Sequence, residues 1–300
     1  MKLNYSSVSR NQSLASVHRL YYLAQNNLWD APGELQWAIE HYGKTPLEPS
    51  TEQALVNILS LIYWGELAAW NISCQLAAEL TSYEAKMAAT AQAHDEARHF
   101  TAIEDYLKWR GYLIPMPMAS EVSSVLHGIG NSNTLPRKLL GMQLMVEPIA
   151  LSLIQLLRKQ SMCPVLDHIL GLIERDEARH VALGTKYLPI LLVGISTKER
   201  ILLWTWQLQI LSKEIRALKE MEPDLLLLGI DLDEAFALGE KKQLDCLGEI
   251  ITGQESETVL TCAKEFVRAK KREVFYGDRP APLIIVQKLI SNFGSRYGVW

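Results

Sequence analysis

Two short segments of the chain carry the same acidic and imidazole side chains at the same spacing. Residues 94–100 read HDEARHF, and residues 175–181 read RDEARHV. Each copy places a glutamate three residues before a histidine, giving the pairs Glu96–His99 and Glu177–His180. In an α-helix a three-residue step returns to the same face, so each pair can bind one metal ion. A single match is common by chance, but two near-identical copies predict a metal site.

A further glutamate precedes the glutamate of each copy by thirty residues and lies in an apolar stretch. These residues are Glu66, in IYWGELAAW, and Glu147, in MQLMVEPIAL. Four uncompensated carboxylates in a protein core would cost many kcal/mol or would have to stay protonated, whereas two divalent cations would cancel their charge. An interior polar network, or charges on exposed helix faces, is the alternative explanation of the repeat.

Each repeated unit has the length of a helical hairpin whose turn falls halfway, near residues 81 and 162. Thr81 and Glu84 form a capping-box pattern at the first position. At the second position, Ser161–Pro164 interrupts the helical pattern, and its proline suits the first turn of a new helix. Steps of three and four residues from each candidate ligand follow mainly apolar seams. The seams are Leu55, Leu59, Ile62, Glu66, Ala69; Ala85, Ala89, Gln92, Glu96, His99, Ile103, Tyr106; Leu140, Gln143, Glu147, Ala150, Ile154; and Leu166, Leu170, Ile173, Glu177, His180, Gly184, Tyr187. The candidate ligands therefore lie where four helices would form a bundle core.

The composition is that of a globular chain of 300 residues, with 48% hydrophobic and 21% charged residues and a formal net charge of −4. This balance, without a dense basic patch, argues against a nucleic-acid-binding protein. The four cysteines are widely spaced with no C-x-x-C pair, so we expect free, buried thiols in a reducing cytoplasm. Residues 1–12 lack the apolar core of a secretory signal, and the apolar runs 188–193 and 225–230 are too short to span a membrane. A cytoplasmic location without a membrane partner is the expectation.

We expect one all-α domain over residues 1–300, because no strand pattern is long enough to build a sheet. Its parts are a helical lead-in at 1–49, a metal bundle at about 50–192 and a helical C-terminal extension at 197–300. Within the extension, helices are expected at 197–221, 231–251 and 255–274. A break in the lead-in is expected at Ala31–Gly33.

Proline and serine residues predict several helix boundaries. The first bundle helix is expected to begin at a Ser50-x-x-Gln53 cap, and a polar, glycine-rich crossover is expected to end at Pro136. Pro148 removes a helical hydrogen bond directly after the third glutamate and predicts a bend or bulge there. Pro189 is expected to disturb the last turn of the fourth bundle helix.

The doubled pattern resembles the ferritin-like non-haem di-iron carboxylate superfamily, over about residues 60–190. The resemblance implies a ferritin-like four-helix bundle with additional N- and C-terminal helices. It implies two iron ions, with manganese as the alternative, held by two sets of residues: Glu66, Glu96 and His99, and Glu147, Glu177 and His180. By the same resemblance, Glu96 and Glu177 would bridge the ions, and open positions would bind dioxygen.

The residues beside the ligands are repeated as well. In the monooxygenase-like members of the superfamily, an aspartate next to the glutamate accepts the free N–H of a metal-bound histidine. The matching residues here are Asp95 and Asp176, and Arg98 and Arg179 are expected to pair with them across the bundle. Ordinary pairing of charges on a helix surface is the alternative.

Single positions separate the branches of this superfamily. Ile103 stands where ribonucleotide reductase radical subunits usually carry a tyrosine, and Leu151 stands where the longer multicomponent hydroxylases keep a hydroxyl. The scattered cysteines exclude a rubredoxin site of the rubrerythrin kind, whereas soluble acyl-carrier-protein desaturases match the Glu-x-Arg-His form. The p-aminobenzoate N-oxygenases share the doubled motif and the size, but Ile173 replaces their additional histidine. Glu174, beside it, is a candidate extra ligand, with a surface position as the favoured alternative.

The resemblance implies an oxygen-dependent di-iron monooxygenase that N-oxygenates or hydroxylates a small organic or carrier-tethered substrate in secondary metabolism. An acyl-carrier-protein desaturase is the enzymatic alternative, and a ferroxidase, peroxide-scavenging or metal-storage protein is the alternative from another class. The expected partners are O2, the substrate, an electron donor of the ferredoxin or flavin reductase type, and a second copy of the chain in a homodimer. The substrate itself is left open by the sequence.

Overall fold

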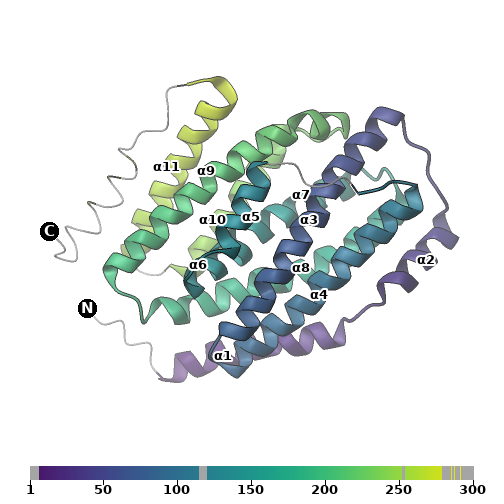
Figure 1. Cartoon of the computed structure of the whole chain (residues 1–300). Coiled ribbons are helices and arrows are strands. Elements are labelled where there is room, and N and C mark those ends of the chain that lie inside the picture. Colours follow the sequence, from purple (N-terminus) through teal and green to yellow (C-terminus); the bar gives the residue numbers. More distant parts are fainter. Residues whose placement is uncertain are drawn as a thin grey trace.

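The computed structural model describes residues 7–114, 120–251 and 254–278, together with Ile285, Gln287 and Ser291. All regular structure in these residues is helical (Figure 1), which confirms the all-α prediction. In chain order the helices are α1 Ser7–Asn26, α2 Ala31–Tyr42, α3 Pro49–Glu79, α4 Tyr83–Arg110, α5 Glu121–Gly130, α6 Leu135–Leu139, the π-helix η1 Leu140–Val146, α7 Glu147–Lys159, α8 Pro164–Leu192, α9 Thr197–Leu227, α10 Leu232–Ile250 and α11 Gln254–Tyr276.

Four helical rods form the central bundle. Helix α3 packs on α4, α7 packs on α8, and α4 packs on α8; the third rod is continuous from α6 through η1 into α7. The lead-in helices α1 and α2 pack against α4 and α8, whereas α9 packs against α3 and α10 packs against α7. Figure 1 shows these two sets of additional helices on opposite sides of the bundle. The bundle is therefore covered on both sides, as a buried polar site requires.

The interior of the bundle consists of two apolar cores with a polar layer between them. On α3, Leu55–Ile62 belongs to one core and Ala69–Leu80 to the other, with Glu66 in the gap. On α4, Glu96 and His99 lie in the corresponding gap. The order of the two cores reverses between these helices, because neighbouring rods run antiparallel. The rod formed by α6, η1 and α7 and helix α8 show the same alternation, so all four rods bring their polar positions to one level.

The apolar seams that the sequence predicted are buried in this interior. All of their members are buried except Ala150, which is half-buried. The two hairpin turns also lie where the ligand spacing predicted them, between Glu79 and Tyr83 and between Lys159 and Pro164. Helical periodicity thus gave the buried face of each bundle helix correctly.

Several predicted helix ends are wrong in detail. Ser82, not Thr81, caps α4, because its hydroxyl accepts the N–H of Ala85. Helix α3 begins at Pro49 with Glu48 as its N-cap, and no side chain caps it, so the Ser50 cap is not used. The lead-in breaks before Ala31, because the carboxylate of Asp30 caps α2 and Pro32 fits its first turn.

The crossover and the proline-containing helices α8 and α9 differ from the prediction, whereas α10 and α11 lie within two residues of their predicted bounds. The crossover contains α5, whose N-cap Ser120 forms a capping box with Ser123. Helix α8 continues through Pro189 to Leu192, and α9 continues through Pro223 to Leu227. Packing of the flanking turns maintains both helices despite the hydrogen bond that each proline removes.

A π-helix occupies residues 140–146, directly before Glu147. The N–H of Glu147 bonds to the carbonyl of Met142, five residues earlier, and a π-turn is defined by this spacing. The bulge predicted from Pro148 is therefore present on the N-terminal side of the proline. It adds a residue to the turn that precedes Glu147 and so changes the direction in which this side chain points.

Within the described part of the chain, two helical stretches are long and apolar enough to cross a membrane by length and composition, Pro49–Glu79 and Leu135–Lys159. Their most apolar windows are 56% and 67% buried inside the protein. Both stretches are rods of the central bundle, so their apolar character is accounted for by the core.

The cysteine prediction is correct in part. All four cysteines are free, and three of them are buried. Cys74 is exposed, contrary to expectation, because it lies on the outward face of α3.

A close contact between α8 and η1 predicts a stability defect. A Cβ added at Gly184 would lie 2.6 Å from the Cβ of Gln143, which cannot move without η1. We expect Gly184→Ala to lower the free energy of unfolding by about 1–3 kcal/mol in urea denaturation, because overpacking outweighs the better helix propensity of alanine. In Gly248→Ala, where the added atom meets nothing within 4 Å, the same exchange should be neutral or stabilising. An equal change in the free energy of unfolding in the two variants would contradict the predicted clash between residue 184 and Gln143.

Candidate metal centre

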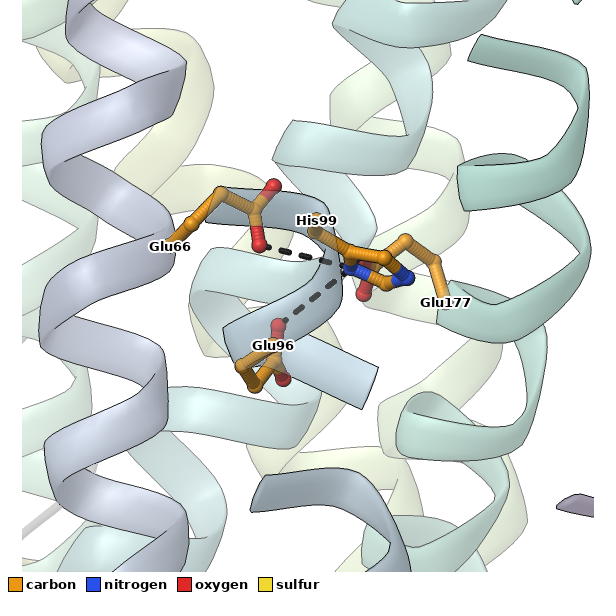
Figure 2. Close-up of side chains that lie close together, drawn as sticks. All are labelled: Glu66, Glu96, His99 and Glu177. Carbon is orange, nitrogen blue, oxygen red and sulfur yellow. Dashed lines mark ion pairs between the residues drawn. The ribbon is translucent and has the colours of Figure 1, made fainter. Parts of the chain in front are cut away.

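The six candidate ligands come together in the polar layer. Atoms of Glu66, Glu96, His99 and Glu177 form one group, and atoms of Glu96, Glu147, Glu177 and His180 form a second, each within 4.8 Å. Figure 2 shows the first group, with Glu66 from α3, Glu96 and His99 from α4, and Glu177 from α8. Glu96 and Glu177 belong to both groups, so these two carboxylates lie between the two sets.

Both histidines direct the same ring atom into the cluster. Nδ1 of His99 lies 3.0 Å from an oxygen of Glu177 and 3.4 Å from an oxygen of Glu66. Nδ1 of His180 lies 2.9 Å from Glu177 and 3.1 Å from Glu96. The cluster therefore contains two Nδ1 atoms and the oxygens of four carboxylates, and all six side chains are buried.

The other ring atom of each histidine faces an aspartate of the opposite helix. Nε2 of His99 lies 3.3 Å from Asp176, and Nε2 of His180 lies 3.3 Å from Asp95. An aspartate in this place accepts the Nε2 proton and leaves Nδ1 free to bind a metal ion. The repeated Asp-Glu-x-x-His motif thus works across the helix pair: each copy supplies the aspartate for the histidine of the other.

Arg98 and Arg179 complete this ring. Arg98 pairs with Asp95 on its own helix and with Asp176 at 2.8 Å. Arg179 pairs with Asp95 at 2.9 Å and with Asp176 at 2.8 Å. Two positive and two negative side chains are therefore balanced next to the cluster, and these four residues do not form the surface pairs of the alternative explanation.

Nothing in the sequence indicates that Trp29 joins this ring. Its indole N–H donates to Asp176 at 2.7 Å, its ring lies parallel to that of His99 at 6.3 Å, and Arg98 lies over it. Trp29 lies in the turn between α1 and α2, and no repeated spacing connects it with the motif. Only the packing of the lead-in on α4 and α8 places it here.

Two buried glutamines also contact the cluster. The side-chain amide of Gln92 donates to Glu96 at 2.9 Å and to Glu147 at 3.0 Å. The side-chain amide of Gln143 in turn donates to the side-chain oxygen of Gln92 at 3.1 Å. Both residues lie in the predicted seams, four positions before Glu96 and Glu147. A polar residue in an apolar seam was the signal that could have identified them.

Glu174 lies apart from the cluster. Its carboxylate accepts from Gln155 at 2.7 Å and pairs with Arg158, both on α7. Its atoms are in neither group of gathered donor atoms. Glu174 therefore lies outside the candidate metal site, which is the alternative that the sequence favours.

The charges of the cluster strongly perturb one another. Burial raises the pKa of Glu66 and of Glu147 well above the usual range, and the neighbouring carboxylates raise that of Glu147 further. Burial also opposes ionisation of Glu177, but the two histidines lower its pKa well below the usual range. Burial opposes the charge of His99 too, yet the surrounding carboxylates raise its pKa well above the usual range. Protons and metal ions therefore compete for these atoms.

The donor set fits a metal site. Oε2 of Glu96 and Nδ1 of His99 are buried and have no hydrogen-bond partner among the described residues, although Nδ1 lies close to three carboxylates. Buried polar atoms without partners are costly, and a cation at the centre would satisfy them. Carboxylates with one imidazole per group are the ligands that iron and manganese take in helical bundles.

A cavity of about 160 Å³ opens beside the cluster. Glu66 and Glu147 form part of its wall, which is otherwise mainly apolar and comes from α3, α5, η1, α7, α9, α10 and α11. On α9, Glu214 also lines the cavity, and it accepts a hydrogen bond from Gln243 of α10 at 2.8 Å. The additional C-terminal helices therefore close a cavity over one side of the cluster.

No protein-family model matches the sequence, and no curated protein matches it. Among solved structures, the chain is similar to a Synechococcus protein with aldehyde deformylating oxidase activity, with a TM-score of 0.59 and 16% identity over 71% of this chain and 97% of that chain. It is also similar to a Bacillus halodurans protein assigned to the class I ribonucleotide reductases, with a TM-score of 0.50 and 18% identity over 92% of this chain and 99% of that chain. These similarities confirm the ferritin-like fold that the doubled motif predicted.

The ring of aspartates and arginines predicts that removing the charge of one aspartate strongly destabilises the protein. Asp176→Asn keeps the size of the side chain but leaves Arg98 and Arg179 with a single buried carboxylate partner. We expect the free energy of unfolding to fall by about 3 kcal/mol in urea denaturation, because breaking one side of a buried ion pair leaves charge uncompensated. The exposed Asp245→Asn exchange on α10 should change it by less than about 0.5 kcal/mol. A small effect at Asp176 would show that the ring contributes little to stability.

Burial of Glu214 predicts that the stability of the protein depends on pH. Burial raises the pKa of Glu214 from 4.5 to about 7. Between these values the unfolded chain loses the proton while the folded chain keeps it, so stability decreases as the pH rises. The loss from this group is about 3 kcal/mol between pH 4.5 and pH 7 and is complete above pH 7.

The same group gives a matched comparison for this pH dependence. Glu214→Gln should lack the loss, so the difference in unfolding free energy between wild type and variant should grow from pH 5 to pH 7.5. Glu220→Gln, an exposed exchange on the same helix, serves as the control for removing an acidic residue. Parallel pH profiles for wild type and Glu214→Gln would rule out the raised pKa.

Proposed function

We propose that this ferritin-like chain is an oxygen-dependent di-iron oxidoreductase. Glu66, Glu96 and His99 would hold one iron ion, and Glu147, Glu177 and His180 the other, with Glu96 and Glu177 shared. The single observation that carries the proposal is the pair of gathered donor sets at one buried level, both sharing the same two carboxylates. The names of the two similar proteins, an oxidase and a ribonucleotide reductase, both describe redox chemistry.

When bound, the ions would allow dioxygen to be reduced and a substrate to be oxidised at this site. The protein supplies the surroundings. Asp176 and Asp95 hold the Nε2 protons of the histidines, which orients both rings and fixes Nδ1 as the ligand atom. Gln92 holds Glu96 and Glu147 in place through its amide. The two apolar cores exclude water from the level of the cluster.

The cavity favours an enzyme over a storage protein. Its wall includes Glu66 and Glu147, so a substrate in it would contact the carboxylates that hold the ions. A metal-storage protein has no need of an apolar cavity at this place. Hydroxylation or N-oxygenation of a small organic molecule is the reaction that we propose, and desaturation of an acyl chain is the second candidate, since the apolar wall suits a hydrocarbon.

The partners follow from this proposal. The reaction needs O2 and two electrons from an external donor, of the ferredoxin or flavin reductase type. We propose a cytoplasmic enzyme without nucleic-acid or membrane partners, and a homodimer as the assembly.

Iron loading tests the proposal directly. Protein reconstituted anaerobically with ferrous iron should contain two irons per chain and, after exposure to air, show an absorption band of an oxo-bridged ferric pair. The Glu96→Ala, Glu177→Ala double variant should lose the band and bind less than one iron, because both shared carboxylates are removed.

Glu174→Ala is the matched control, because this glutamate lies three residues before Glu177 on the same helix but outside the cluster. It should retain two irons and the band. Wild-type protein with less than one metal per chain, or a double variant that behaves like wild type, would overturn the di-iron assignment. Uptake of far more than two irons per chain would instead support storage.

A further inference from the structure

The cavity beside the cluster has an unbalanced charge. Four acidic residues line it, Glu66, Glu147, Glu214 and Glu240, and its described lining contains no lysine, arginine or histidine. Glu66 and Glu147 face the metal site and would be neutralised there. Glu214 and Glu240 belong to neither donor group, so no metal ion in the cluster binds them.

Glu214 is built into this wall but is only half satisfied. One carboxyl oxygen accepts the amide N–H of Gln243 at 2.8 Å, and the same amide donates to the carbonyl of Met145 at 3.0 Å. The other oxygen, Oε1, is buried without a hydrogen-bond partner among the described residues, and the side chain is only 8% exposed. A buried carboxyl with one unpartnered oxygen, in the wall of an apolar cavity, can be satisfied by a hydrogen-bond donor from a ligand.

The charge decides which ligand fits. Above pH 7, where Glu214 has lost its proton, a ligand carboxylate would be repelled by Glu214 and by Glu240 and would find no cation among the described lining residues. An ammonium group supplies the missing positive charge and donates to the free oxygen, and a charged hydrogen bond of this kind is stronger than a neutral one. We infer that the cavity binds a small apolar amine, with its ammonium group on Glu214 and its hydrocarbon part along the apolar wall toward Glu66 and Glu147.

The volume limits the size of this amine. An apolar protein cavity of about 150 Å³ holds benzene, so a cavity of about 160 Å³ takes a molecule of roughly six to eight non-hydrogen atoms. Hexylamine and benzylamine have this size. Because the nitrogen is held outside the cluster, the part of the amine presented to it is carbon. Resting on the proposed function, the inference therefore makes oxidation of a C–H bond, not of the nitrogen, the expected reaction.

Calorimetric titration with three ligands of one chain length tests the inference. Iron-loaded protein is titrated anaerobically with hexylamine, hexan-1-ol and hexanoate at a pH of about 8, where Glu214 is ionised. We expect hexylamine to bind at least about 10-fold more tightly than hexan-1-ol, and hexanoate to bind most weakly. Glu214→Gln should weaken hexylamine about 10-fold or more while changing hexan-1-ol by less than about 3-fold.

Glu240→Gln is the matched control, because it removes the other acidic residue of the wall outside the cluster. It should weaken hexylamine by less than about 3-fold. Thermal unfolding of both variants shows that they are folded. Equal loss in the two variants, no loss in Glu214→Gln, or preference for the alcohol or the acid would overturn the inference.

The outcome is separable from that of the proposed function. If no iron binds, the same titration of the metal-free protein tests the amine site, and loss of hexylamine affinity only in Glu214→Gln supports it while the di-iron proposal fails. If two irons bind and react with oxygen but the amine shows no preference, the di-iron proposal stands and the amine site is wrong.

Discussion

Burial of four carboxylates and two imidazoles at one level is the constraint on which the rest of the structure depends. The two apolar cores remove water on both sides of this level, so the charges can be balanced only by protons or by bound cations. The carboxylates of the cluster respond in opposite directions. Burial raises the pKa of Glu66 and Glu147, whereas the histidines lower the pKa of Glu177. Under the proposed function, a pair of metal ions would replace the protons with fixed charge.

The second feature is the exchange between the two copies of the motif. Each aspartate serves the histidine of the opposite helix, and each arginine bridges both aspartates. The antiparallel pairing of α4 and α8 makes this possible, because it brings two identical sequences face to face with opposite direction. Trp29 then joins the ring from the lead-in, which gives the helices outside the bundle a direct contact with the site.

The cavity depends on departures from regular helix. The π-helix before Glu147 interrupts the third rod at the level of the cluster, and the carbonyl of Met145 within it holds Gln243. Helices α9 and α10 bring Glu214 and Gln243 to the wall from far along the chain. The bundle therefore supplies the donor atoms, while the additional helices supply the shape and charge of the neighbouring space.

The sequence by itself determined the bundle helices, their buried faces and the six candidate ligands, because helical periodicity and a repeated motif are local patterns that survive without knowledge of packing. It did not give the α5 helix in the crossover, the start of α4 at Ser82, or the contact of Trp29 with Asp176. The contacts of Glu174 with α7, the Gln92 contacts and the cavity with Glu214 were likewise decided only by the tertiary structure. The physical reason is that these features join residues distant in the chain, and their energy comes from packing and desolvation that exist only once the helices have assembled.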